Sequence, residues 1–352
     1  MATNNPLAGT AQSAKAVSSK TFCIAGINTD VFGLDDISPA TKSVSCLWLL
    51  HPRLQTKEIM ASVADSCIND WNQRPASERT VGLIAVAFDQ RNHGGRKVHA
   101  LANESWREGN ETHAQDMYSI YHGTALDTSL LIDHLGSYIF NKPNDLSITQ
   151  HLVMGISLGG HSAWQVLFNE PRVTAGVVII GCPDYIDLMT DRARLSKLPT
   201  YTSSTPPGST FLGSPSFPPA LLNTLQKSDP RSILFSSSPI PPSSSLTKPQ
   251  QSQLAPLLSS HLANKQILVC SGAIDKLVPY ACSKPFLDFL KEAADRERGW
   301  WKEGGCRVDD RVYEGVGHNF SEGMRRDTVG FVRRILEAEE KKGKEKEGSS
   351  RL

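Results

Sequence analysis

The sequence predicts an α/β protein with a mainly parallel β-sheet covered by helices on both faces. Short apolar runs, such as residues 46–50 and 81–88, are typical of buried strands. Apolar residues at helical spacing follow them, in residues 57–71 and 116–140. Strands that alternate with such helices usually pair in parallel. The 352 residues exceed the usual domain length of roughly 100–200 residues, which leaves room for an insertion.

The second half of the chain continues this alternation. We expect strands at residues 176–181, 266–270 and 307–312, and helices at residues 285–294 and 324–339. An α/β core therefore resumes after a long interruption between the first two of these strands.

The interruption divides the chain into predicted regions. Residues 21–183 and 264–339 form the expected core, and residues 184–263 form an insertion. Twelve of the chain's 21 prolines lie between residues 199 and 256, and serine is dense there. We expect a lid over the site, and the alternative is a linker with no role in substrate choice. Residues 1–20 are expected to be disordered, and residues 340–352 to form a charged tail.

Within the insertion, two short segments have helical patterns. They are residues 186–197 and 219–225, which could cover a site. The Pro- and Ser-rich remainder offers little apolar surface to offset the entropy cost of ordering. We therefore expect flexible loop there.

The most informative motif is Gly-Ile-Ser-Leu-Gly at residues 155–159. It follows an apolar strand and precedes a helical pattern, which is the order of a nucleophile elbow. Gly155 and Gly159 suit a turn with no room for side chains on either side of the serine. We expect Ser157 to be a nucleophile, presented at the N-terminus of a helix that stabilises developing negative charge.

A serine nucleophile needs a base, usually a histidine oriented by a carboxylate. Candidates occur in the order Ser157, Asp275 and His318, and the last two directly follow predicted strands. Sites assemble at that edge of an open α/β sheet. Asp184 and Asp187, which follow the preceding strand, remain alternatives for the acid.

The oxyanion of such a mechanism needs two backbone N–H groups. One is expected from Leu158, the residue after the nucleophile. The other should come from the loop after the strand at residues 46–50. Pro52 has no N–H to donate, so we expect Arg53 to supply it, with Leu54 as the alternative.

These motifs together resemble the alpha/beta hydrolase superfamily over residues 44–336. A further shared feature is the Asp-x-Arg-x-His-Gly loop at residues 89–94, in which Arg91 and His93 are expected to brace the structure. The resemblance implies the alpha/beta hydrolase fold, with a lid inserted before the acid strand. In that superfamily the loop before Arg53 usually contains His-Gly, so Pro52 is a departure from its pattern.

Three segments also resemble a fungal group of peroxisomal hydrolases. They are residues 47–53, 88–94 and 155–161. This group includes hydrolases of host-selective toxin biosynthesis, in which an epoxy-decatrienoic acid moiety is made. The resemblance implies a place in secondary-metabolite biosynthesis.

The expected activity is that of a serine hydrolase that cleaves a small acyl ester or thioester, such as an acyl-CoA or a fatty-acid-like intermediate. The same three residues could instead serve acyl transfer or lactone chemistry. A binding protein on a hydrolase scaffold is a third hypothesis, although such chains typically lose one of these residues. An epoxide hydrolase or dehalogenase would carry Asp in place of Ser157. The expected chemistry needs no metal or organic cofactor.

Composition excludes several classes of protein. The net charge is +1, so nothing favours nucleic acid or an anionic membrane surface as a partner. No apolar run approaches the roughly 20 residues of a membrane span, and the first twenty residues lack the pattern of a secretory signal. Seven scattered cysteines, with Cys46, Cys182 and Cys270 in apolar strands, are expected to be free thiols in a reducing compartment.

The sequence ends in Ser350-Arg351-Leu352, a conservative form of the Ser-Lys-Leu peroxisomal address. We therefore expect delivery to the peroxisome through the peroxisomal import receptor, with the cytoplasm as the alternative.

Overall fold

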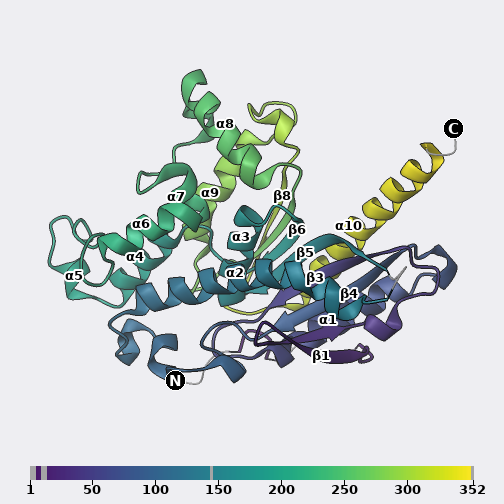
Figure 1. Ribbon diagram of the computed structural model, residues 1–352. Helices are drawn as coiled ribbons and strands as arrows, with labels where there is room; N and C mark the ends of the chain where they lie inside the picture. Colours follow the sequence, from purple (N-terminus) through teal and green to yellow (C-terminus); the bar gives the residue numbers. More distant parts are fainter. Residues whose placement is uncertain (1–4, 9–13, 143–145, 350–352) are drawn as a thin grey trace.

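The computed structural model describes residues 5–8, 14–142 and 146–349 (Figure 1). The strands of its sheet are β1 (Ser19–Ile24), β2 (Ile27–Phe32), β3 (Ser43–Leu50), β4 (Val81–Phe88), β5 (Ile148–Ile156), β6 (Val173–Ile179), β7 (Gln266–Gly272) and β8 (Arg307–Tyr313). The α-helices are α1 (Ala61–Asn72), α2 (His113–Ile139), α3 (Leu158–Asn169), α4 (Tyr185–Leu195), α5 (Pro199–Thr202), α6 (Pro219–Ser228), α7 (Pro230–Phe235), α8 (Lys248–Leu262), α9 (Tyr280–Ala293) and α10 (Glu322–Ser349).

The described strands form one sheet in the order β1-β2-β4-β3-β5-β6-β7-β8. β1 and β2 form an antiparallel hairpin that pairs with β4, and all later pairings are parallel. The predicted mainly parallel sheet is therefore confirmed. Its centre is β3 and β5, where Trp48 is paired with Val86 on one side and Val153 on the other.

Each face of the sheet buries its own hydrophobic core, because successive side chains of a strand point to opposite faces. On β3, Trp48 belongs to the core beneath α2, α3, α8 and α9, whereas Leu47 and Leu49 belong to the core beneath α1 and α10. Strands buried on both faces read as continuous apolar runs, which explains the sequence of β3 and β4.

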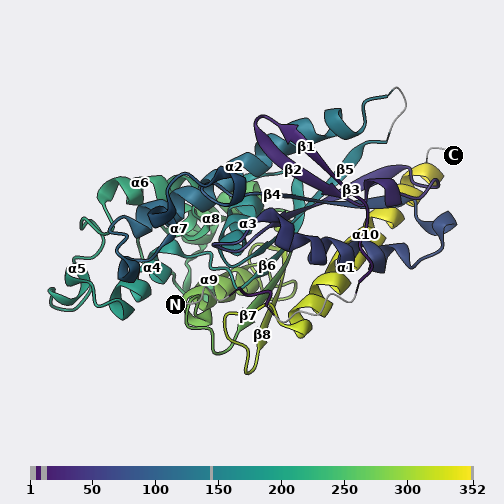
Figure 2. The same cartoon turned by 90° about the horizontal axis from the view of Figure 1, so that it is seen from below.

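The insertion is more helical than expected. The two predicted helices are present as α4 and α6, but α7 and α8 also form in the part expected to be flexible. Figures 1 and 2 show α4–α7 gathered at one end of the molecule and α1 and α10 at the other. Phe211, Phe217 and Leu225 of the insertion are buried with residues of α2 and α4 in a third core. Sparse apolar residues at these few positions are enough to order the segment.

The helix α8 belongs to the core layer and not to a lid. Its buried residues Leu258 and Leu262 join the same core as Trp164 of α3. The insertion that could act as a lid is therefore shorter than the predicted 184–263.

The expected disorder of residues 1–20 is wrong for its described part. Leu7 is buried, and Pro6 O accepts a hydrogen bond of 2.8 Å from Phe320 N. Val17 N donates to Asp65 Oδ1 at 3.0 Å, and β1 begins at Ser19. These contacts order the segment although most of its residues are small or polar.

The last helix also differs from its predicted end at residue 339, because α10 continues to Ser349. Glu340, placed in the charged tail by the sequence, is buried and accepts hydrogen bonds from Thr80 N and Val81 N. Its other oxygen pairs with Arg74 at 2.8 Å. The core therefore reaches at least to Glu340. Ser350-Arg351-Leu352 lies outside the described residues.

Among the described residues, no helix combines the length and apolarity that crossing a membrane requires.

Candidate active site

Ser157 occupies the tight turn between β5 and α3. Its φ of 55° and ψ of −113° are unusual for a residue with a side chain. Ser157 N donates to Ile179 O at 2.9 Å, and Ser157 O accepts from His161 N at 3.0 Å. The turn is thus held from the neighbouring strand and from the helix it opens, which lets the fold sustain a strained residue.

The glycines on either side are required by close backbone packing. A Cβ atom on Gly155 would lie 1.9 Å from Gly159 O, and one on Gly159 would lie 2.0 Å from Leu50 O. Neither neighbour is the end of a flexible side chain. The local structure is therefore the nucleophile elbow that the motif predicts.

Ser157, His318 and Asp275 are hydrogen bonded in series. Ser157 Oγ lies 2.9 Å from His318 Nε2, and His318 Nδ1 lies 2.8 Å from Asp275 Oδ2. Because a carboxylate only accepts, Nδ1 carries the proton and Nε2 can accept from the serine hydroxyl. The Asp275 side chain is fully buried and that of His318 is 9% exposed. This geometry can convert the serine hydroxyl into a nucleophile.

The loops that carry Asp275 and His318 are packed tightly together. Asp275 Oδ1 accepts hydrogen bonds from Leu277 N at 2.8 Å and Val278 N at 3.0 Å, which orients the carboxylate. A Cβ atom on Gly272, at the end of β7, would lie 2.5 Å from Gly317 O, beside the histidine.

The alternative acids lie elsewhere. Asp184 caps the N-terminus of α4 by accepting from Asp187 N, and its other oxygen lies 3.3 Å from Arg231 Nε. Desolvation raises the pKa of Asp187, and the side chain faces Cys282. His318 Nδ1 therefore donates its hydrogen bond to Asp275 and to neither rival.

The loop after β3 borders the same pocket as Ser157. Pro52, Arg53 and Leu54 all line it. Within the described part of the chain, the backbone N–H groups of Arg53 and Leu158 donate to no other protein atom. Both are therefore available to a ligand, as an oxyanion hole requires.

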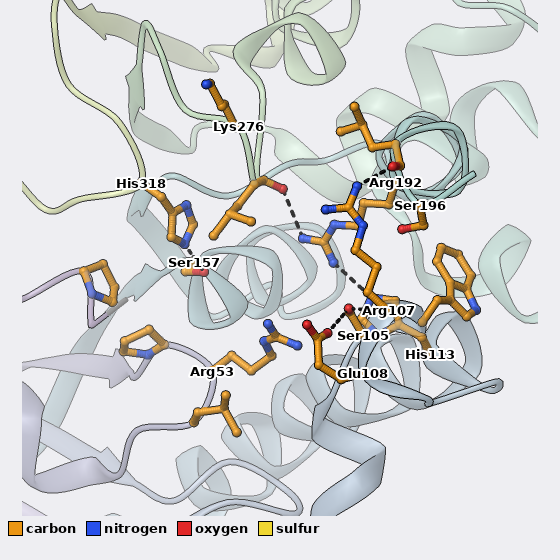
Figure 3. A pocket seen from close by; sticks show the side chains of 16 residues that line it. Arg53, Ser105, Arg107, Glu108, His113, Ser157, Arg192, Ser196, Lys276 and His318 are labelled. Carbon is orange, nitrogen blue, oxygen red and sulfur yellow. Dashed lines mark hydrogen bonds between the residues drawn. The ribbon is translucent and has the colours of Figure 1, made fainter. Parts of the chain in front are cut away.

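The pocket has a volume of about 280 Å³ and a distinctly basic lining. In the view of Figure 3, Ser157 and His318 lie on one side and Arg107, Arg192 and Ser196 on the other. Arg192 and Ser196 come from the end of α4 and the residues after it. The insertion thus contributes directly to the lining of the pocket.

No protein-family model and no curated protein matches the sequence. Solved structures do match. TT1662 from Thermus thermophilus has a TM-score of 0.56 at 18% identity, covering 92% of this chain and 99% of that one. The Pyrococcus furiosus esterase Pf2001 has a TM-score of 0.46 at 14% identity, covering 93% and 92%. The acylaminoacyl peptidase of Pyrococcus horikoshii has 0.48 at 13%, covering 93% of this chain and 41% of the peptidase, less than half its length.

The likeness to TT1662 spans almost the whole of both chains. The chain has the α/β-hydrolase fold. At such low identity the likeness establishes the fold and nothing finer.

In this α/β-hydrolase fold the Asp-x-Arg-x-His-Gly loop is hydrogen bonded to α2 and within itself. Arg91 forms two hydrogen bonds with Asp127 of α2, at 2.9 and 3.1 Å. His93 Nδ1 lies 2.9 Å from Arg91 O, and Asp89 accepts from Gly95 N. The Arg91–Asp127 pair ties the loop to α2, and the other two bonds lie within the loop itself.

Across the described residues no cluster of three or more His, Cys, Asp or Glu could hold a metal ion. Cys46, Cys182 and Cys270 are buried free thiols, as expected.

Sequence reasoning missed the arginines of the pocket, Arg107 and Arg192. Neither lies in a motif, and Arg192 belongs to a segment whose helical pattern is ordinary. Their meeting beside Ser157 depends on how the insertion folds back, which local spacing does not encode.

Proposed function

We propose that this protein is a serine hydrolase that cleaves an acyl ester or thioester. The observation that carries the proposal is the unbroken series of hydrogen bonds from Ser157 through His318 to Asp275. The open pocket at Ser157 and the elbow geometry support it further.

In the proposed reaction, Ser157 Oγ attacks the substrate carbonyl while His318 Nε2 takes the hydroxyl proton. The carbonyl oxygen becomes an oxyanion that accepts hydrogen bonds from Leu158 N and Arg53 N. The bond to the leaving alcohol or thiol then breaks, and His318 gives that group the proton. Water then attacks the acyl-enzyme while His318 takes a proton from it. His318 returns that proton to Ser157 Oγ, which releases the carboxylic acid and restores Ser157. Asp275 orients the imidazole and stabilises its cationic form.

A second candidate is acyl transfer or lactone chemistry, because an alcohol or amine can replace water in the second half of the reaction. The pocket's exposure to solvent favours hydrolysis. Product analysis tests this choice. The purified protein would be given p-nitrophenyl and CoA acyl esters, with and without an added alcohol. The free acid should be the main product, and a dominant ester product would indicate a transferase. A binding protein without catalysis would give neither.

We propose peroxisomal delivery through Ser350-Arg351-Leu352 and its import receptor, and a role in fungal secondary-metabolite or toxin biosynthesis through the resemblance described above. Imaging a fluorescent protein fused ahead of the chain, with and without these three residues, tests delivery. A cytoplasmic signal from the intact fusion would contradict it.

A further inference from the structure

Arg192, on α4, is a partly buried cation without an anionic partner. Its guanidinium donates to Leu277 O at 3.2 Å and contacts Met117 Sδ at 2.8 Å and His113 Nε2 at 3.4 Å. It forms no salt bridge with any Asp or Glu that the structure describes. A desolvated charge left with neutral acceptors is costly, so such an arginine indicates a missing anion.

The imidazole of His113 is neutral, so it does not supply that anion and does not offset the charge of Arg192. His113 Nδ1 lies 2.8 Å from Glu104 O, so Nδ1 carries the proton and Nε2 accepts. Burial, followed by the nearby charges of Arg192 and Arg53, lowers the pKa of His113 to about 3. Burial also lowers the pKa of Arg192, to about 10, with a further contribution from the charge of Arg53.

Other cations line the same pocket, namely Arg53, Arg107 and Lys276. Arg53 donates to the backbone oxygen of Asn103 at 2.7 Å, and Arg107 donates to that of Leu195. The one carboxylate among the lining residues, Glu108, is exposed and accepts from the Ser105 hydroxyl, without a salt bridge to an arginine. Glu104 and Glu108 partly offset the charge of Arg53, whereas Arg192 has no carboxylate partner among the described residues.

This charge is coupled to the catalytic residues through Leu277. Leu277 O accepts from Arg192, and Leu277 N donates to the carboxylate of Asp275. A group bound by Arg192 would thus lie in the same pocket as Ser157, separated from the triad by one short loop. The pocket volume of about 280 Å³ is near the lower end of the usual range for ligand sites, roughly 300–1,000 Å³, which favours a small ligand.

We propose that the natural substrate is a small acyl ester or thioester whose acyl part carries a free carboxylate, and that Arg192 binds this carboxylate. The inference rests on the proposed hydrolase function and specifies its substrate class. A planar guanidinium matches a carboxylate in a two-point hydrogen-bonded pair. Arg192 is then a residue of substrate specificity, and Ser157 attacks a different carbonyl of the same molecule.

The test compares two substrates that differ in one charge, the p-nitrophenyl half-ester of glutaric acid and its methyl-capped diester. The wild-type protein should have a kcat/KM about 10- to 100-fold higher for the half-ester. Arg192→Leu should lose that preference, measured within the variant as the ratio of its kcat/KM values for the two substrates. Arg192→Lys should retain part of it. Arg194→Leu is the matched control, because Arg194 lies exposed on the same helix and pairs with Asp191, and it should keep the wild-type preference.

Inhibition of the wild-type protein gives a readout independent of folding in the variants. Free glutarate should compete with substrate, and glutaramide should not. Equal rates on both substrates, an unchanged preference in Arg192→Leu, or equal inhibition by glutaramide would overturn the inference. A preference for acetyl-CoA over glutaryl p-nitrophenyl ester would also overturn it. The positive charge of the pocket would then recognise the phosphate groups of CoA and not a carboxylate. Failure of the proposed function is distinguished by a wild-type protein that hydrolyses none of these esters.

Discussion

The side chain of His51 is hydrogen bonded to the carbonyl oxygen of Pro52, with 2.8 Å between His51 Nδ1 and Pro52 O. His51 Nε2 accepts a hydrogen bond of 2.9 Å from Gln90 N, so Nδ1 carries the proton and donates to Pro52 O. That carbonyl belongs to the same planar peptide unit as Arg53 N–H, and in a trans peptide the two point in opposite directions. His51 therefore fixes the direction of the N–H that we assign to the oxyanion.

The first prediction concerns His51→Phe, which removes the bond to Pro52 O but keeps an aromatic ring. The Arg53 peptide would then be free to rotate, and kcat on an acyl ester should fall about tenfold or more with a smaller change in KM. His51→Asn, whose amide can donate to the same oxygen, should recover part of kcat. Steady-state kinetics measure both, with thermal unfolding as a check on folding. Equal kcat in His51→Phe and the wild type would refute this role.

The second prediction concerns the elbow glycine Gly159. A Cβ atom there would meet Leu50 O at 2.0 Å, so Gly159→Ala should displace the turn or the strand beside it. We expect lower thermal stability and loss of ester hydrolysis together, measured by calorimetry and kinetics on the same sample.

Gly136→Ala is the matched control for that substitution. Gly136 lies inside α2 with no atom near the position of a new Cβ. Alanine should stabilise this helix by about 1 kcal/mol and leave hydrolysis unchanged. If Gly159→Ala behaved like Gly136→Ala, the close packing assigned to the elbow would be wrong.

The third prediction is a loss of stability in acid that arises from buried neutral histidines. Burial lowers the pKa of His51, His113 and His161 to about 3. The unfolded chain takes up protons near pH 6.5, so the stabilisation is present above that pH and is lost as pH falls towards 3. Each histidine contributes a slope of up to about 1.4 kcal/mol per pH unit.

This slope is measured by urea unfolding at pH 7 and pH 5. Between these two pH values the free energy of unfolding should drop in both proteins, and the drop should be about 1–2 kcal/mol smaller in His161→Gln than in the wild type. His134→Gln, on the exposed surface of α2, controls for the substitution itself. An identical loss in His161→Gln and the wild type would contradict the assignment.

The fourth prediction has the opposite sign and concerns Asp229, which caps α7. Burial and the neighbouring charge of Asp184 raise the pKa of Asp229 to about 7, and burial raises that of Asp184 to about 6. The folded state therefore holds these two acids protonated more readily than the unfolded chain does. This contribution to the free energy of unfolding is present below about pH 4 and is lost as pH rises through 6 to 7. Asp229→Asn retains an acceptor for Ser232 N and cannot ionise.

The stability of Asp229→Asn should therefore fall less than that of the wild type between pH 5 and pH 8. Urea unfolding at the two pH values measures the difference. A steeper fall in the variant would show that the ionised carboxylate stabilises the insertion, contrary to this account.

The central sheet and the hydrogen-bonded series of Ser157, His318 and Asp275 were predictable because their signals are local. Buried parallel strands such as β4 are continuous apolar runs, and the elbow is a five-residue motif. Asp275 and His318 follow strands directly, so the edge of the sheet alone brings them together.

Features set by distant contacts were not predictable from the sequence. Glu340 is a charged residue in a charged tail, and its burial depends on the backbone of Thr80 and Val81. The path of the insertion depends on a few aromatic residues such as Phe217 packing on α2. Arg192 reaches the pocket only through that packing.

The most direct test of the central claim is covalent labelling of Ser157 by a fluorophosphonate, followed by peptide mapping. Wild-type protein should be labelled at Ser157, and Ser157→Ala should not be labelled although it folds. His318→Ala and Asp275→Asn should label far more slowly and lose about 10⁴-fold in ester turnover, with little further loss when combined. Labelling at another residue, or folded wild-type protein that neither labels nor hydrolyses any ester, would contradict the account.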